Sequence, residues 1–170
     1  MIVIVMGVSG CGKTTIGELL ADRLGCAFSD ADDFHPAANV EKMRAGSPLS
    51  DDDRRPWLQA PRRAIEGWQA AGESRVIACS ALKAAYRVQL SPQDDAIFVF
   101  LKGGTETIAA RLDARKGHYM DPGLLASQLA TLEEPADAIA VNIAPPPAAI
   151  ADKIMARLDA RGLHQEKRRT

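Results

Sequence analysis

The sequence predicts an α/β fold with three αβα layers, in which helices cover both faces of a parallel sheet. Two observations predict this fold: short apolar runs alternate with stretches of helical spacing, and the first apolar run leads directly into a glycine-rich turn. Strands that alternate with helices form βαβ units, whose crossover helices bury both faces of the sheet. The chain has 170 residues, of which 46% are hydrophobic and 25% charged, an ordinary balance for one compact domain.

Five apolar runs predict a five-stranded sheet. Residues 2–6 form a continuous, β-branched run, which is typical of a strand buried on both faces. The other predicted strands are residues 26–28, 75–79, 96–101 and 140–143. Ligands of such sheets bind at the carboxyl ends of the strands, so the residues that follow each strand are candidates for a site.

Stretches of helical spacing separate these strands. Residues 14–24 place apolar side chains on one face and stop at Gly25. Pro56 and Pro61 are expected to interrupt another helix, residues 51–71. The remaining predicted helices are residues 37–45, 82–90, 106–115 and 149–160.

The same pattern sets the expected domain organisation. Residues 116–135 are polar and punctuated by glycine and proline, and we expect them to form a helical lid. Residues 1–163 then make a single domain that carries this lid. The basic tail, residues 164–170, has no apolar face and is expected to fray.

Composition excludes several classes of partner. The formal net charge is -1, so no global basic field attracts nucleic acid or an anionic membrane. No apolar run approaches the roughly 20 residues that span a bilayer, and the first residues do not resemble a signal peptide. Cys11, Cys26 and Cys79 are odd in number and far apart, which predicts neither a disulfide framework nor a zinc site. We therefore expect a cytoplasmic protein without nucleic-acid or membrane partners.

A phosphate loop follows the first strand. Residues 7–14 read Gly-Val-Ser-Gly-Cys-Gly-Lys-Thr and match the pattern G-x-x-x-x-G-K-[ST], which arises by chance in below about 1% of chains this long. Its glycines let backbone N–H groups curl around an anion at the positive end of the next helix. Lys13 would contact the β- and γ-phosphates of ATP, and the Thr14 hydroxyl would hold Mg²⁺. The predicted nucleotide contacts are Gly7, Ser9, Gly10, Cys11, Gly12, Lys13, Thr14 and Thr15.

Three carboxylates follow the second predicted strand. Extended spacing would put Asp30 and Asp32 on one side and Asp33 on the other. We assign Asp30 to Mg²⁺, and Asp32 to orienting or deprotonating an acceptor hydroxyl. The alternative is an acidic turn that caps the next helix. Nearby, His35 is either a hydrogen-bond donor to substrate or a structural residue.

From this point the motifs resemble the gluconate kinases, a branch of the phosphate-loop small-molecule kinases that also includes shikimate kinases. The stretches that carry the resemblance, in order, are residues 7–14, Asp30-x-Asp32-x-x-His35-Pro36, Asn39-x-x-Lys42-Met43, Gly46-x-Pro48-Leu49-x-Asp51-x-Asp53-Arg54-x-Pro56-Trp57-Leu58, Cys79-Ser80-Ala81-Leu82-Lys83-x-x-Tyr86-Arg87, Arg111-x-x-x-Arg115-x-x-His118, Leu125-x-x-Gln128 and Leu132-Glu133-x-Pro135. They extend from Val5 to about Pro135, and the ordered set is highly specific. The departures are small: Cys11 replaces a usual serine, Tyr119 replaces a usual phenylalanine, and Asp33 is an additional acid.

The resemblance implies an ATP:D-gluconate 6-phosphotransferase that uses Mg²⁺ and acts on a small-molecule sugar acid. The fold it implies is a five-stranded parallel sheet with a lid, similar to that of adenylate and shikimate kinases. It also implies a homodimer, because many members of the family are homodimers, although the sequence itself shows no dimer surface.

A gluconate site must neutralise one carboxylate, which guanidinium and ammonium groups do well. Arg54 lies in a helix that begins after Ser50, a good N-cap, and is a candidate. It could instead pair with Asp51 or Asp53 on a solvated face. Tyr86 is expected to be a packing residue.

Two further cations follow the third predicted strand. Lys83 and Arg87 are four residues apart and would share one helix face, so that both reach the same anion. Ser80, at the end of the strand, would contact substrate and cap the helix. The alternative is that all three are structural.

The last candidates surround the lid. Arg111 and Arg115 are again four apart, and one or both would swing over the phosphates, with Arg115 also assigned to catalysis. Their alternative role is to complement the helix dipole. On the lid, His118 and Gln128 would reach the substrate.

Two competing functions stay open at this point. One is a kinase for another small hydroxy acid, such as shikimate, on the same fold. The other, from a different class, is a nucleotide-binding regulatory module without an acceptor. The charge balance and the lack of a basic, aromatic-studded stripe disfavour a nucleic-acid-binding ATPase.

Overall fold

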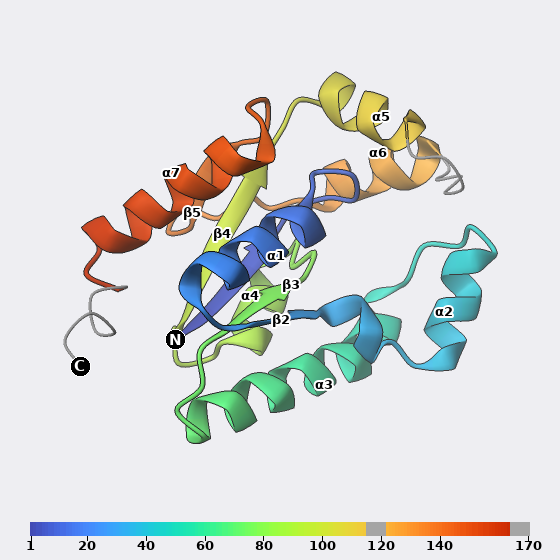
Figure 1. Cartoon of the computed structure of the whole chain (residues 1–170). Helices are drawn as coiled ribbons and strands as arrows, with labels where there is room; N and C mark the ends of the chain where they lie inside the picture. The colour runs from blue at the N-terminus through green and yellow to red at the C-terminus, as the bar shows by residue number, and fades with distance from the viewer. Residues whose placement is uncertain (115–121, 164–170) are drawn as a thin grey trace.

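The computed structural model describes residues 1–114 and 122–163, which form a parallel sheet between layers of helices (Figure 1). Its strands run in the order β2-β3-β1-β4-β5, and each neighbouring pair is parallel. Their bounds are β1 (Ile2–Met6), β2 (Ala27–Asp30), β3 (Arg75–Ala78), β4 (Ala96–Lys102) and β5 (Ile139–Asn142). The predicted five-stranded parallel sheet is confirmed.

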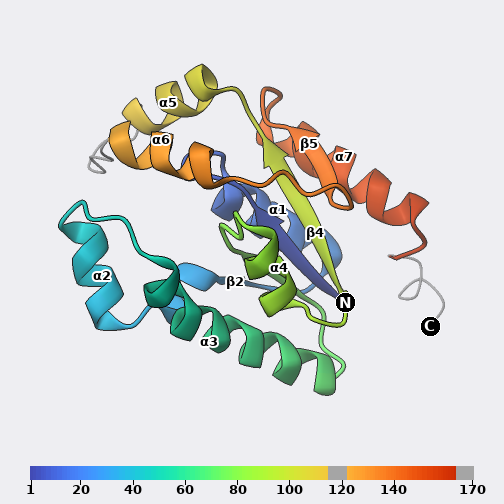
Figure 2. The ribbon, with the colours of Figure 1, turned by 180° about the vertical axis from the view of Figure 1, so that it is seen from behind.

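Helices cover both faces of this sheet. Those described are α1 (Lys13–Leu24), α2 (Ala37–Arg44), α3 (Asp51–Ala70), α4 (Ala84–Leu90), α5 (Thr105–Asp113), α6 (Pro122–Thr131) and α7 (Pro147–Ala160), with a short 3-10 helix η1 (Ala31–Phe34). Helices α1 and α7 lie on one face, and α3 and α4 on the other (Figures 1 and 2). Helices α5 and α6 lie beyond the carboxyl ends of the strands, near the phosphate loop (Figure 1). No helix within the described ranges is long and apolar enough to cross a bilayer.

The core has two layers, because successive side chains of the central strand β1 point to opposite faces of the sheet. Val3 and Val5 pack in a cluster with side chains of α1 and α7. Ile4 and Met6 point the other way and pack with side chains of α3 and α4. Every residue of β1 is buried, so the strand lies between two hydrophobic layers.

Helix α3 corrects one prediction: it continues through Pro56 and Pro61 instead of being interrupted. A proline inside a helix costs about 3 kcal/mol, so other interactions must outweigh that cost. The helix begins with a capping box, in which Ser50 and Asp53 satisfy each other's backbone N–H groups. It also buries one apolar face through Trp57, Leu58, Pro61 and Ile65.

Gly103, directly after β4, offers a test of the packing of the core. A Cβ atom at this position would overlap the side chain of Ile143, which is fully buried and cannot move aside. Gly103→Ala should therefore lower the free energy of unfolding by about 1–3 kcal/mol in urea denaturation. Gly67→Ala is the matched control, because nothing lies within 4 Å of its added methyl group. The control should gain about 0.5–1 kcal/mol, since alanine favours a helix. Equal stability of the two variants would contradict this packing.

Candidate active site

The phosphate loop connects β1 to α1. Gly7, Gly10 and Gly12 have φ angles of 144°, 83° and 99°, a region of backbone conformation that favours glycine. The Lys13 ammonium bends back over the loop and donates to the carbonyls of Gly7 (3.2 Å) and Val8 (3.3 Å). The loop, the first turn of α1 and one ammonium thus meet at one place, which suits the phosphates of a nucleotide.

Thr14 and Asp30 lie together beside this loop. The Thr14 hydroxyl donates to Asp30 Oδ2 at 3.2 Å. Mg²⁺ prefers oxygen ligands and keeps several waters, so this pair could help hold it. Within residues 1–114 and 122–163, no group of three or more His, Cys, Asp or Glu side chains could hold a metal ion. Phosphate oxygens and water would therefore complete the coordination.

Asp32 does not follow the extended geometry expected of it, because the chain turns into η1 after Asp30. Asp30 caps this turn, and its Oδ1 accepts from the Asp32 backbone N–H at 3.0 Å. The predicted alternation of the three carboxylates is therefore wrong. The Asp32 side chain is 72% exposed. Desolvation by its surroundings, together with the Asp30 charge, raises the pKa of Asp32 above its usual value, and Lys13 opposes this rise.

The His35 side chain is buried next to Asp32. Its ring stacks on Trp57, with centroids 4.2 Å apart and an angle of 11° between the planes. The side chain is only 4% exposed, and Nε2 lies 3.7 Å from Asp32 Oδ1. Burial and the nearby Arg54 charge lower the pKa of His35 to about 4, so the ring is neutral at pH 7. Such a buried ring offers little surface to a substrate, contrary to the predicted direct contact.

A pocket of about 370 Å³ lies between the start of α3, the residues that lead into α4, and helix α6. Three predicted substrate-binding residues line it: Arg54 from α3, Lys83 at the start of α4, and Gln128 from α6. It contains basic, acidic and amide groups within one small volume. This combination suits a small, polar, anionic ligand.

An ion-pair cluster forms one wall of the pocket. The Lys83 ammonium donates to both carboxylate oxygens of Asp51, at 2.9 and 2.7 Å, and the Tyr86 hydroxyl donates to the same carboxylate. Arg54 lies next to them, 3.4 Å from the Tyr86 hydroxyl. Hydrogen bonds from Lys83 and Tyr86 lower the pKa of Asp51. Sequence reasoning named Asp51 only as an alternative partner of Arg54 and treated Tyr86 as packing, because helical spacing does not relate α3 to α4.

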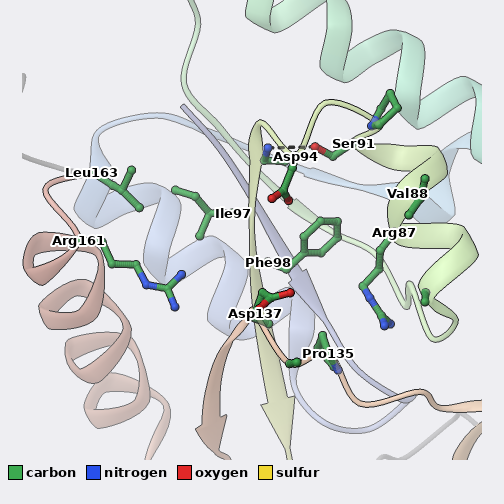
Figure 3. Close-up of a pocket in the computed structure, with 15 residues that line it drawn as sticks. Arg87, Val88, Ser91, Asp94, Ile97, Phe98, Pro135, Asp137, Arg161 and Leu163 are labelled. Carbon is green, nitrogen blue, oxygen red and sulfur yellow. Dashed lines mark hydrogen bonds between the residues drawn. The ribbon is translucent and has the colours of Figure 1, made fainter.

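Arg87 corrects another prediction, since it does not share an anion with Lys83. Its guanidinium donates to the carbonyls of Ala81 (3.1 Å), Leu82 (3.3 Å) and Glu133 (3.0 Å). It lines a separate cavity of about 570 Å³ at the amino end of β4, beside Phe98 and Pro135 (Figure 3). Lys83 is the N-cap of α4 and lies outside the helix face that carries Arg87. Arg87 therefore ties the β3–α4 loop to the segment after α6.

Ser80 lies at the carboxyl end of β3, next to the phosphate loop. Its carbonyl accepts from the backbone N–H of Gly7 at 3.3 Å. It does not cap α4, because Lys83 occupies that position.

Arg111 and Gln128 both contact the phosphate loop. The Arg111 guanidinium donates to the carbonyls of Cys11 (3.5 Å) and Ile143 (2.6 Å). Gln128 Oε1 accepts from the Ser9 N–H at 2.7 Å, while its Nε2 donates to Ser9 Oγ at 3.0 Å. Because Gln128 also lines the pocket of about 370 Å³, it joins that pocket to the phosphate loop.

The predicted residues Arg115 and His118 lie outside the described residues. Residues 116–121 of the predicted lid also lie outside the described residues. Helix α6 is described and belongs to the predicted lid.

Comparisons with known proteins find relatives over most of the chain. A family model described as shikimate kinase matches residues 9–159. The gluconokinase of Gluconobacter oxydans is 51% identical over 135 residues, which cover 79% of this chain and 76% of that protein. The thermoresistant gluconokinase of Escherichia coli is 43% identical over 150 residues, covering 85% and 86% of the two chains.

Solved structures give the same result. The crystal structure of a gluconokinase from Sinorhizobium meliloti superposes with a TM-score of 0.84 at 41% identity, covering 96% of each chain. The likeness extends across the sheet and the surrounding helices, and is not confined to the phosphate loop.

Proposed function

Because this chain belongs to the gluconokinase family of phosphate-loop kinases, we propose that it transfers the γ-phosphoryl group of ATP to the 6-hydroxyl of D-gluconate. The product is 6-phospho-D-gluconate. The observation that carries the proposal is the basic pocket joined to the phosphate loop through Gln128. A phosphoryl donor and a small anionic acceptor would meet at this junction.

The wall of the pocket already binds a carboxylate, that of Asp51. Lys83 and Tyr86 donate to it, and Arg54 lies beside the Tyr86 hydroxyl. Charge-assisted hydrogen bonds of this kind recognise the carboxylate of a sugar acid equally well. We assign the gluconate carboxylate to Lys83 and Arg54, where it would compete with Asp51 for the Lys83 ammonium.

The residues of the phosphate loop would hold the donor. Lys13 and the loop N–H groups would neutralise and orient the phosphates, and Arg111 lies close by, on the Cys11 carbonyl. Mg²⁺, held near Thr14 and Asp30, would supply further neutralisation of phosphate charge. Arg115 and His118 remain predictions for the phosphates and the acceptor.

Asp32 would orient the acceptor hydroxyl. Its carboxylate is exposed in the turn that Asp30 caps, and the Lys13 charge acts on it. A carboxylate in this position can accept the hydroxyl proton as the oxygen attacks in line with the bond that breaks. Closure of the lid over the reactants would exclude water, so that ATP is not hydrolysed instead.

We also propose a single kinase domain over residues 1–163, with the lid at about residues 116–135. The proposed setting is the cytoplasm, and the proposed assembly is a homodimer, as the family resemblance implies.

Lys83→Met should raise the KM for D-gluconate by about 10- to 100-fold, since a charge-assisted hydrogen bond contributes about 1.5–3 kcal/mol. The KM for ATP should stay unchanged, because Lys83 does not contact the phosphate loop. Steady-state kinetics with each substrate varied in turn would measure both constants.

Lys102→Met is the matched control. Lys102 also pairs with a carboxylate, Glu134 at 2.6 Å, but it does not line the acceptor pocket. An unchanged KM for D-gluconate in Lys83→Met would remove Lys83 from the carboxylate site. A rise in both KM values would point to general damage instead.

The position of transfer can be tested on the product. NMR of ¹³C-labelled gluconate after reaction with ATP and Mg²⁺ should show phosphorus coupling at C6. Coupling at another carbon would contradict the proposed 6-phosphotransferase activity while keeping the kinase.

A further inference from the structure

We propose that His35 positions the Asp32 carboxylate through its Nε2–H, in a tautomer that Asn39 selects, and does not itself bind the acceptor. The inference rests on the proposed function, because it takes Asp32 as the group that orients the acceptor hydroxyl. Asn39, Trp57 and His35 would then form a support beneath the reacting groups.

The His35 ring is fixed by packing. It stacks on Trp57 at 4.2 Å, with the two planes only 11° apart. Trp57 is held in turn, because its Nε1–H donates to the Ala31 carbonyl at 2.9 Å. Ala31 directly precedes Asp32, so this bond fixes the Trp57 ring relative to the backbone that carries the Asp32 carboxylate.

Asn39 selects the tautomer of the ring. Its Nδ2 lies 3.4 Å from His35 Nδ1 and also donates to the Asp53 carbonyl at 3.0 Å. An amide nitrogen can only donate, so Nδ1 must accept, and the neutral ring carries its proton on Nε2. Asn39 is 4% exposed, so leaving its N–H groups unpaired would be costly. The pKa of His35, lowered to about 4 by burial and by Arg54, keeps the ring neutral at pH 7.

The protonated nitrogen faces Asp32. Nε2 and Asp32 Oδ1 are 3.7 Å apart, which is longer than a hydrogen bond. Catalytic hydrogen bonds are often long without substrates and tighten when the substrates bind. The Asp32 backbone is anchored on Asp30, whereas its carboxylate is 72% exposed, so the carboxylate needs a side-chain partner to hold one direction.

Two substitutions separate the effect of the N–H group from the effect of the ring. His35→Phe keeps an aromatic ring on Trp57 but has no N–H, and His35→Gln keeps an N–H but has no ring. If His35 positions Asp32, His35→Phe should lower kcat by about 10- to 100-fold, since small misplacements of catalytic groups have effects of this size. The KM values for ATP and D-gluconate should change little, and His35→Gln should restore most of the lost kcat.

NMR on the wild-type protein tests the same arrangement without relying on His35→Phe. The chain has 3 histidines, so the His35 signals can be assigned by their loss in His35→Gln. The ¹⁵N shifts should report a proton on Nε2 and none on Nδ1 at pH 7. A proton on Nδ1 would overturn the proposal, even if His35→Phe failed to fold.

The kinetic outcomes are equally decisive. A near wild-type kcat in His35→Phe, with a loss in His35→Gln, would mean that the ring matters only for packing. A rise in the KM for D-gluconate at unchanged kcat would mean that His35 binds the acceptor directly. Each result would overturn the positioning role. Failure of the proposed function would look different, because wild-type protein would then not phosphorylate D-gluconate at all.

Discussion

Replacing Asp32 with asparagine should lower kcat by about 10²–10⁴-fold, the range that a positioned acid–base group contributes. Asparagine keeps the shape of the side chain but removes the negative charge that would accept the hydroxyl proton. The affinity for ATP should be nearly unchanged, because the nucleotide contacts are expected from the phosphate loop. Turnover of D-gluconate measures the change in kcat. Titration calorimetry with a non-hydrolysable ATP analogue measures the affinity for the nucleotide.

Asp33→Asn is the matched control for this prediction. Asp33 is an exposed carboxylate in the same 3-10 turn, next to Asp32 in sequence. Its removal should leave kcat close to wild type. Near wild-type turnover in Asp32→Asn would remove Asp32 from the mechanism, whatever the control shows.

Lys13→Met should lower kcat/KM for ATP by about 10²–10³-fold, as expected for the loss of one preorganised charge at the reacting phosphate. The Lys13 ammonium is held over the loop by the carbonyls of Gly7 and Val8, where the phosphates are expected. The increase in Tm that ATP produces should also shrink, since at the same concentration a ligand that binds more weakly stabilises a protein less.

Lys153→Met controls for the loss of a lysine as such. Lys153 is exposed on α7. This helix lies on the same face of the sheet as α1, opposite the face that α3 covers (Figure 1). Its removal should change neither the kinetics nor the thermal shift. A full ATP-dependent thermal shift together with unimpaired turnover in Lys13→Met would contradict the assignment of the loop.

The features that could be predicted from sequence are those set by neighbours along the chain. Residues 2–6 are all apolar and residues 7–14 match a strict pattern, so the first strand and the phosphate loop follow from local composition. The strand β2 was placed less well, because it runs to Asp30 and its end depends on the turn that follows. Helix α3 departs from its sequence pattern, because its cap and buried face outweigh two prolines.

The rest of the site depends on contacts between distant segments. Tyr86 and Asp51 are 35 residues apart, and only the packing of α4 against α3 brings them together. The spacing of four residues between Lys83 and Arg87 is equally misleading as a sign of a shared anion. Lys83 is the N-cap of α4, whereas Arg87 donates to backbone carbonyls. Helical spacing carries no information on such tertiary partners.

The measurement that tests the central claim most directly is ADP release from ATP and Mg²⁺ with a panel of acceptors. The panel contains D-gluconate, shikimate, glycerate, nucleoside monophosphates and a control without acceptor. We expect strong stimulation by D-gluconate and little by the others, because the proposed site offers Lys83 and Arg54 to its carboxylate. The pocket volume of about 370 Å³ also limits the size of the acceptor. Stimulation by another acceptor but not by D-gluconate would contradict the proposed substrate, and ATP binding without acceptor-dependent turnover would contradict the kinase.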